Sequence, residues 1–167
     1  AHPAYSQGGM LHCYDYPAWR ERGGALLRHV VNRYKDHPAL HVWGLWDGIN
    51  LSSAWVDQSD GGYPCYCEST LGRWKAWLAE NFTLNEFNAR VQRRFPSWED
   101  VEPPRSNDNV VEMMVYRRFH YENLAGHLRW MIDLAKEIDP VHETRTHGAW
   151  VPRPWDEVCA AEADSWG

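Results

Sequence analysis

The feature that most constrains the fold is the alternation of helical and strand-like patterns along the chain. A long helical pattern covers residues 109–138, where apolar positions such as Leu128 and Ile132 recur three or four residues apart. The short, apolar and ring-rich segment at residues 40–46, before this helix, is typical of a buried strand, and residues 143–147, after it, are a second candidate strand. Strands that alternate with helices pair in parallel through right-handed crossovers, so this order predicts an α/β fold.

Further helical patterns occupy much of the remaining chain. The first begins near Asp15, a residue type that caps helix N-termini, and stops before Pro38. Other helices are expected at 69–80, after the capping box of Thr83 and Glu86, and at 155–161, with a last strand at 164–167. The long segment at 47–67 is expected to be a functional loop. Three strands cannot close a barrel, so they form either a small open sheet or a segment of a larger wound structure.

Charge and composition exclude several classes of protein. Lys and Arg number 17 against 23 Asp and Glu, a net charge of −6, which disfavours binding to nucleic acid because phosphate contact needs a basic surface. No stretch approaches the roughly 20 apolar residues that span a bilayer, so we expect no membrane-spanning segment. The 11 Trp, 8 Tyr and 4 Phe exceed the needs of an average core and suggest that flat apolar faces are presented to a ligand.

Several segments carry a family resemblance. Residues 13–20 read CYDYPAWR and match a Cys-Pro-Asn-Ser-Pro-x-Tyr-Arg pattern at Cys13, Pro17 and Arg20. The other matching segments, in order, are Tyr34 to Leu40 followed by Trp43, Cys65-Tyr66-Cys67, Phe95 to Arg105, and Tyr116 to Phe119. Together they resemble glycoside hydrolase family 42, the bacterial β-galactosidases built on a clan A (β/α)8 barrel.

The resemblance implies a fold and an activity for the whole protein. Residues 1–167 would be a single segment of the catalytic domain, incomplete at both ends: a partial TIM (β/α)8 barrel of about strands 4 to 6 with helical insertions. The full-length protein would hydrolyse terminal β-galactosides by a retaining mechanism with two carboxylates. In such barrels the active site lies at the C-terminal ends of the strands, here near residues 47–50 and 147–150.

The position of the catalytic acid departs from the family pattern. The family ends its fourth strand on an Asn-Glu pair, and the matching pair here is Asp47-Gly48. Gly48 cannot transfer a proton, so Asp47 is the candidate acid; the alternative is that its carboxylate caps or hydrogen-bonds the following loop. The nucleophile would come from strand seven, outside these residues. The 167 residues alone are therefore expected to be inactive.

Aromatic and polar residues near the strand ends are candidate contacts to a sugar. Indole rings stack on the C–H faces of sugars, while amide and imidazole groups bond the hydroxyls. The predicted substrate-binding residues are Trp46, Asn50, Trp55, His147 and Trp150. The alternatives are core packing for the indoles and a structural hydrogen bond for the histidine.

The cysteines match a structural zinc site of some family members. Cys13, Cys65 and Cys67 stand at three of four thiolate positions, and zinc favours tetrahedral thiolate ligation. The fourth position is Thr70, a poor ligand, so His12 or Glu68 could supply the missing donor. The alternative is a site of reduced thiols that has lost its metal. Apart from zinc, no cofactor is expected.

Two classes of function follow from these departures. The first is a β-galactosidase-like hydrolase acting on a carbohydrate substrate. The second is a barrel that has lost catalysis and acts as a carbohydrate-binding or structural module, an alternative that Gly48 and Thr70 support. A homo-oligomer is compatible with either class, and the sequence leaves the compartment open, with the cytoplasm slightly favoured.

Overall fold

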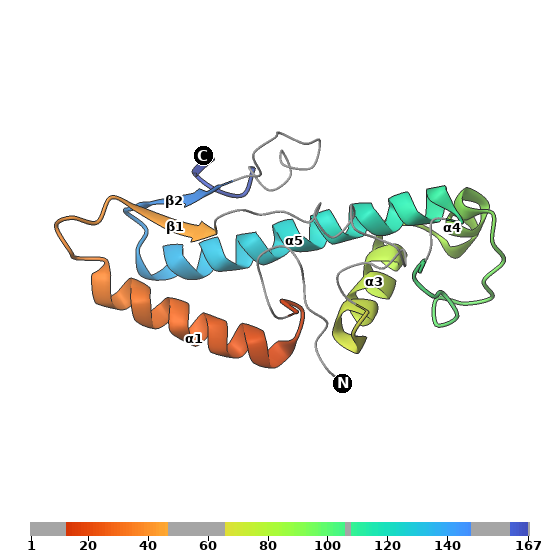
Figure 1. The fold of residues 1–167 in the computed structure, drawn as a ribbon, viewed down its shortest axis with the longest axis horizontal. Helices are drawn as coiled ribbons and strands as arrows, with labels where there is room; N and C mark the ends of the chain where they lie inside the picture. The colour runs from red at the N-terminus through yellow and green to blue at the C-terminus, as the bar shows by residue number, and fades with distance from the viewer. Residues whose placement is uncertain (1–12, 47–65, 106–107, 148–160, 167) are drawn as a thin grey trace.

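The computed structural model describes residues 13–46, 66–105, 108–147 and 161–166 (Figure 1). In chain order, its elements are α1 (Pro17–Tyr34), β1 (Val42–Trp46), α3 (Glu68–Asn81), α4 (Leu84–Val91), α5 (Val110–Ile138), β2 (Glu143–Thr146) and β3 (Ser165–Trp166). The predicted helices at 69–80 and 109–138 and the helix after Thr83 are confirmed, with small shifts at their ends. Residues 47–65 of the loop predicted at 47–67, and residues 155–160 of the helix predicted at 155–161, lie outside the described residues.

The described strands form one parallel sheet in the order β1-β2-β3. Val42 pairs with Glu143 at the start of β1, and Trp46 pairs with Thr146 at its end. Thr146 in turn pairs with Trp166 of β3. The register of β1 against β2 shifts between Gly44 and Trp46. Parallel pairing of β1 and β2 across α5 is the arrangement that the alternating pattern predicts.

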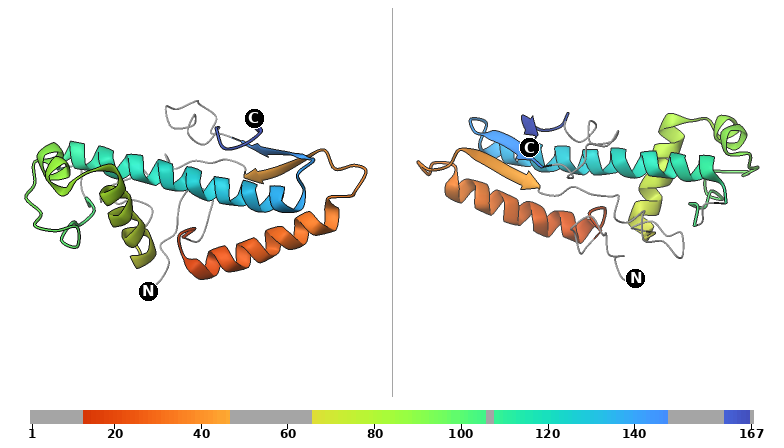
Figure 2. Two further views of the ribbon diagram at one scale, coloured as in Figure 1. Left: turned by 180° about the vertical axis from the view of Figure 1, so that it is seen from behind. Right: turned by 45° about the horizontal axis from the view of Figure 1, so that its top comes forward.

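Helix α5 is the longest described element and joins the two ends of the structure (Figures 1 and 2). Its 29 residues extend over about 43 Å at the usual helical rise. The sheet and α1 lie along its C-terminal half, whereas α3 and α4 lie at its N-terminal half. The described structure therefore has a sheet end and a helical end, which share one helix.

At the sheet end, α1 and α5 pack against β1. Val31 of α1, Trp43 of β1 and Ala135 of α5 form a buried apolar cluster. The indole Nε1 of Trp43 donates a hydrogen bond of 2.9 Å to Oδ2 of Asp139, which follows the last turn of α5. This bond satisfies the only polar atom of the buried ring, so Trp43 is a packing residue.

At the helical end, aromatic rings from α3, α4 and α5 form the core. Trp74 is completely buried at its centre. Its ring centroid lies 4.9 Å from that of Tyr116 and 5.3 Å from that of Phe119, with Trp77 at 5.6 Å and Phe87 at 6.3 Å. Many of the rings that suggested a ligand-binding surface are therefore used for packing.

Helix starts are partly as predicted. Thr83 and Glu86 form the expected reciprocal capping box at the start of α4. The prediction that Asp15 caps α1 is wrong: the N-cap is Tyr16, no side chain caps the helix, and Pro17 is its first residue. Proline at this position needs no amide partner, so Asp15 is available for contacts in the interior.

No described helix is both long and apolar enough to cross a bilayer.

Candidate functional site

The C-terminal ends of β1 and β2 lie side by side and place two predicted substrate-binding residues together. The backbone N–H of His147 donates a hydrogen bond of 3.0 Å to the carbonyl oxygen of Trp46. Both side chains are partly buried. The residues that follow directly in sequence, including the candidate acid Asp47, lie outside the described residues.

The side chain of Trp46 packs toward the helices. It contacts the apolar cluster that contains Leu128 of α5, and its ring meets that of His127 edge-on at 5.7 Å. Trp43, three positions earlier, also faces the helices, although regular alternation would place positions 43 and 46 on opposite faces. The register shift after Gly44 accounts for this, because an irregularity of this kind turns the following side chain to the other face.

His127 lies at the centre of a cluster of rings next to the strand end. The rings of Tyr14, Trp19 and Trp130 each lie 5.1 Å from it, and Trp46 completes the group. Its side chain is fully buried, and neither ring nitrogen has a hydrogen-bond partner among the described residues. Burial, aided by the charges of Arg20 and Arg73, lowers the pKa of His127 to about 3. The imidazole is therefore neutral at physiological pH.

A second cluster joins the residues of the predicted metal site that the structure describes. Sγ of Cys13 lies 3.4 Å from Sγ of Cys67 and 3.3 Å from Oγ1 of Thr70. The distance from Cys67 Sγ to Thr70 Oγ1 is 3.5 Å. These two sulfurs and the hydroxyl oxygen thus form a compact triangle at the start of α3, although Cys13 is 54 residues from Cys67 and 57 residues from Thr70 in sequence.

The described residues supply two cysteines and a threonine of the predicted zinc site. Among these residues, no group of three or more His, Cys, Asp or Glu side chains is placed to hold a metal ion. Tetrahedral ligation, with Zn–S near 2.3 Å and Zn–O near 2.0 Å, separates neighbouring sulfur and oxygen ligands by about 3.5 Å and two sulfurs by about 3.8 Å. The observed separations lie within half an ångström of these values. Glu68, one suggested fourth donor, is exposed, and His12 and Cys65 lie outside the described residues.

Comparison with known proteins identifies the family. The sequence model of the beta-galactosidase family Glyco_hydro_42 matches residues 6–165. The chain belongs to this β-galactosidase family. It is 26% identical over 142 residues to the beta-galactosidase Bga of Halorubrum lacusprofundi, and 29% identical over 139 residues to the beta-galactosidase Pbg of Clostridium perfringens. Each alignment covers 77% of this chain, but only 19% and 18% of the respective relative. The chain thus spans about a fifth of the length of these relatives.

Solved β-galactosidases share the fold. The cold-adapted beta-galactosidase of Rahnella sp. R3 superposes with a TM-score of 0.78 at 21% identity, over 95% of this chain and 24% of its own. The Halorubrum lacusprofundi beta-galactosidase gives a TM-score of 0.76 at 18% identity, over 99% of this chain and 26% of its own. These likenesses establish a partial α/β fold of the kind found in β-galactosidases.

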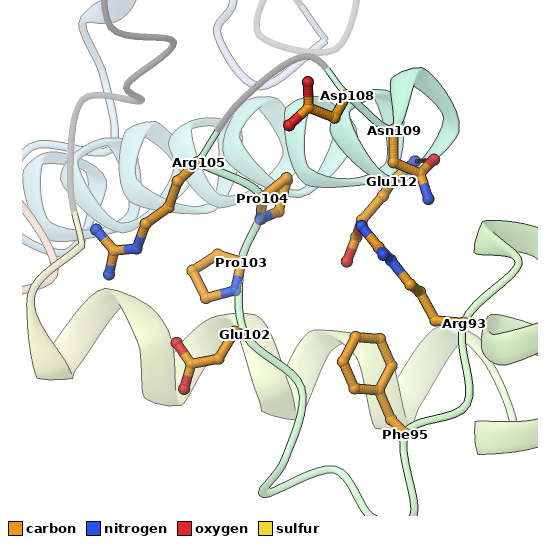
Figure 3. A pocket seen from close by; sticks show the side chains of 9 residues that line it. All are labelled: Arg93, Phe95, Glu102, Pro103, Pro104, Arg105, Asp108, Asn109 and Glu112. Atoms are coloured by element: carbon orange, nitrogen blue, oxygen red, sulfur yellow. Dashed lines mark hydrogen bonds and ion pairs between the residues drawn. The ribbon is translucent and has the colours of Figure 1, made fainter.

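A polar cavity lies at the other end of the β-galactosidase segment, away from the strand ends (Figure 3). Its volume is about 380 Å³, and Figure 3 shows the side chains of Glu112 of α5 and Arg93 next to each other among the lining residues. Burial raises the pKa of Glu112, while the ion pair with Arg93, at 3.3 Å, acts in the opposite direction. This pair neutralises the buried carboxylate and joins the residues after α4 to α5.

The structure adds residues that the sequence motifs do not reveal. Asp15 and Asn123 meet beside the cysteine cluster, and His127 lies beside Trp46. Asp15 stands two residues after Cys13 within the family motif, which is the available signal for it. Asn123 and His127 occupy inward positions of an amphipathic helix, where a polar residue in an apolar stripe is the only local sign. Of the predicted residues, Asn50, Trp55 and Trp150 lie outside the described residues.

Proposed function

We propose that the full-length protein is a glycoside hydrolase that cleaves terminal β-galactosides by a retaining, two-carboxylate mechanism. The family match over residues 6–165 carries this proposal. The substrate class is taken from relatives whose names describe them as β-galactosidases. The juxtaposition of Trp46 and His147 at the ends of parallel strands supports it, because ligands of barrel enzymes bind at this edge.

Within the full-length protein, residues 1–167 form a single segment of the catalytic barrel, with β1, β2 and β3 as about its fourth, fifth and sixth strands. The parallel order and the crossover through α5 support this assignment. The nucleophile belongs to a later strand outside the segment. Carbohydrate is the partner of this site.

Asp47 is the proposed acid of the reaction. Trp46 packs on the helical side of the sheet. Asp47 follows it directly in sequence and stands one position before the site of the family glutamate. Because successive strand residues normally point to opposite faces, this role requires a bend at the strand end that turns the Asp47 carboxyl toward the substrate. The shorter side chain of aspartate remains a difference from the family.

Leaving-group chemistry tests this role. Replacing Asp47 by Asn in the full-length protein should lower kcat/KM for a poor leaving group such as an alkyl galactoside by about 10²–10⁴-fold. A dinitrophenyl galactoside needs no protonation and should be cleaved at a nearly unchanged glycosylation rate. Asp36→Asn, at an exposed position, is the matched control. An equal loss with both substrates would contradict the assignment. NMR of the first-formed sugar anomer reports whether configuration is retained.

The second candidate function is a barrel without catalysis that binds carbohydrate. Gly48 at the position of the family acid/base favours it. An inactive full-length protein that binds galactose by calorimetry, and that gains turnover when Gly48 is replaced by Glu, would establish this alternative. Turnover by the unaltered protein would exclude it.

The segment also has a proposed structural zinc site built from Cys13, Cys65 and Cys67. The ion would join the residues before α1 to the start of α3, and a closed thiolate site contributes to folding rather than to catalysis. Metal analysis of the reduced full-length protein should find one zinc ion per chain. Replacing Cys13 by Ser should abolish its retention.

A further inference from the structure

Arg145 is a cation on the face of the sheet that α1 and α5 do not cover. Both helices lie on the same side of the strands (Figures 1 and 2). Thr144 faces them: it is fully buried, and its hydroxyl donates a hydrogen bond of 3.0 Å to Oδ2 of Asp164, the atom that also binds Lys136 of α5. Thr146 is fully buried as well. Arg145 stands between these threonines and is only partly buried, so its side chain lies on the opposite face.

The neighbours of Arg145 in the sheet leave space beside its guanidinium group. Its partners in the adjacent strands are Gly44 of β1 and Ser165 of β3. A Cβ atom added at Gly44 would meet no atom of the described structure within 4 Å. Nε of Arg145 donates a hydrogen bond of 3.2 Å to Oγ of Ser165. This bond holds the side chain beside β3 and leaves the terminal N–H groups of the guanidinium for other partners.

No carboxylate within the described part of the chain forms an ion pair with Arg145. Acidic side chains that border the sheet have other partners: Asp164 pairs with Lys136, Glu162 with Arg129, and Asp139 with His142. A guanidinium group stays charged at every relevant pH, and a charge enclosed by protein requires a counter-charge. The counter-charge of Arg145 therefore has to come from elsewhere.

Arg145 also lies next to the edge of the sheet where ligands of barrel enzymes bind. It is the last residue of β2 that faces away from the helices, because Thr146 ends the strand. The hydrogen bond from His147 to Trp46 marks this edge. In a (β/α)8 barrel the face away from the helices lines the interior, and the active site lies at the C-terminal ends of the strands. This position is the uppermost layer of the interior, directly below the substrate.

We propose that Arg145 is a specificity-determining residue that binds a carboxylate on the terminal sugar. The substrate class is then β-galacturonides, in which a carboxylate replaces the hydroxymethyl group of galactose. The inference rests on the proposed function. A planar guanidinium donates two parallel hydrogen bonds to a carboxylate, and the space at Gly44 admits the sugar ring. The single charge of a carboxylate matches one arginine, whereas a phosphate dianion would leave a charge without a partner.

Two substrates of the same shape test this role in the full-length protein. Nitrophenyl β-galacturonide carries the carboxylate, and its primary amide is an uncharged analogue. We expect kcat/KM to favour the acid by about 10–100-fold, and Arg145→Met to remove most of this preference. Arg145→Lys keeps the charge but loses the two parallel hydrogen bonds, so it should retain an intermediate preference. Arg94→Met, at an exposed position, is the matched control and should leave the preference unchanged.

The other outcomes separate this inference from the proposed hydrolase activity. Equal losses on the acid and the amide in Arg145→Met would show that Arg145 serves a carboxylate of the protein itself, which overturns the inference. Cleavage of nitrophenyl β-galactoside without any preference for the acid would overturn the inference and leave the hydrolase intact.

Calorimetry with free sugars tests the same site when no glycoside is cleaved. Tighter binding of galacturonate than of galactose, lost in Arg145→Met, would support the carboxylate site while contradicting the hydrolase activity. Equal affinity for the two sugars would overturn the inference. Tighter binding of a galactose phosphate than of galacturonate would also overturn it, since the anion would then be a phosphate.

Discussion

Replacing His127 by Phe should make the stability of the protein less sensitive to acid. The imidazole is fully buried among aromatic rings and lacks a hydrogen-bond partner among the described residues. Phe keeps an aromatic ring in the cluster and removes both the proton site and the two buried nitrogens. The variant thus separates the ionisation of this position from its packing.

The magnitude follows from the pKa of His127. Burial lowers it from the ordinary 6.5 to about 3 in the folded protein. A histidine whose pKa is lowered by folding contributes its full stability above pH 6.5. This contribution is lost as the pH falls toward 3, because the unfolded chain takes up the proton first. Between pH 7.5 and pH 5, the loss from this one group is about 2 kcal/mol. His120, whose pKa burial also lowers to about 3, contributes in the same direction.

The assay is urea unfolding of the full-length protein at pH 7.5 and pH 5, followed by tryptophan fluorescence. Over this interval, the free energy of unfolding should fall in both proteins. The fall should be about 2 kcal/mol smaller in the Phe variant than in the unaltered protein. His29→Gln, on the exposed face of α1, is the control and should leave the difference unchanged. Equal pH dependence in the Phe variant and the unaltered protein would refute the assignment of a neutral, desolvated His127.

Three further variants test other contacts. Trp74→Ala should destabilise the protein by about 3–5 kcal/mol in urea unfolding, because it empties the centre of the aromatic core; a loss below 1 kcal/mol would contradict that placement. Thr83→Ala should lower the free energy of unfolding by about 1 kcal/mol in the same assay, whereas Thr83→Ser keeps the helix cap and should change it little. Burial alone would raise the pKa of Asp139, but hydrogen bonds from Trp43, His142 and Val141 lower it to about 2, so stability is lost as the pH falls from about 4 to 2. Asp139→Asn should therefore reduce the loss of thermal stability between about pH 4 and pH 2, and an unchanged loss would exclude the effect.

The sequence by itself determined the local elements of this protein. Helix α5 was predictable because apolar residues recur at its helical period, and α4 because Thr83 and Glu86 bond each other within one turn. These signals act over three or four residues, so they survive without knowledge of the fold. The cysteine spacing likewise pointed to Cys13 and Cys67 as neighbours through its resemblance to the family, and the structure brings their sulfurs to 3.4 Å.

Only the tertiary structure decided how these elements present their polar groups. Asp15 has the sequence signature of a helix cap, yet it turns inward because Thr70 and Asn123, 55 and 108 residues away, offer hydrogen bonds there. Trp46 faces the helices because the register of β1 shifts beside β2, which the strand pattern alone does not encode. A buried polar group must find its partners wherever packing places them, and packing is set by contacts between segments far apart in the chain.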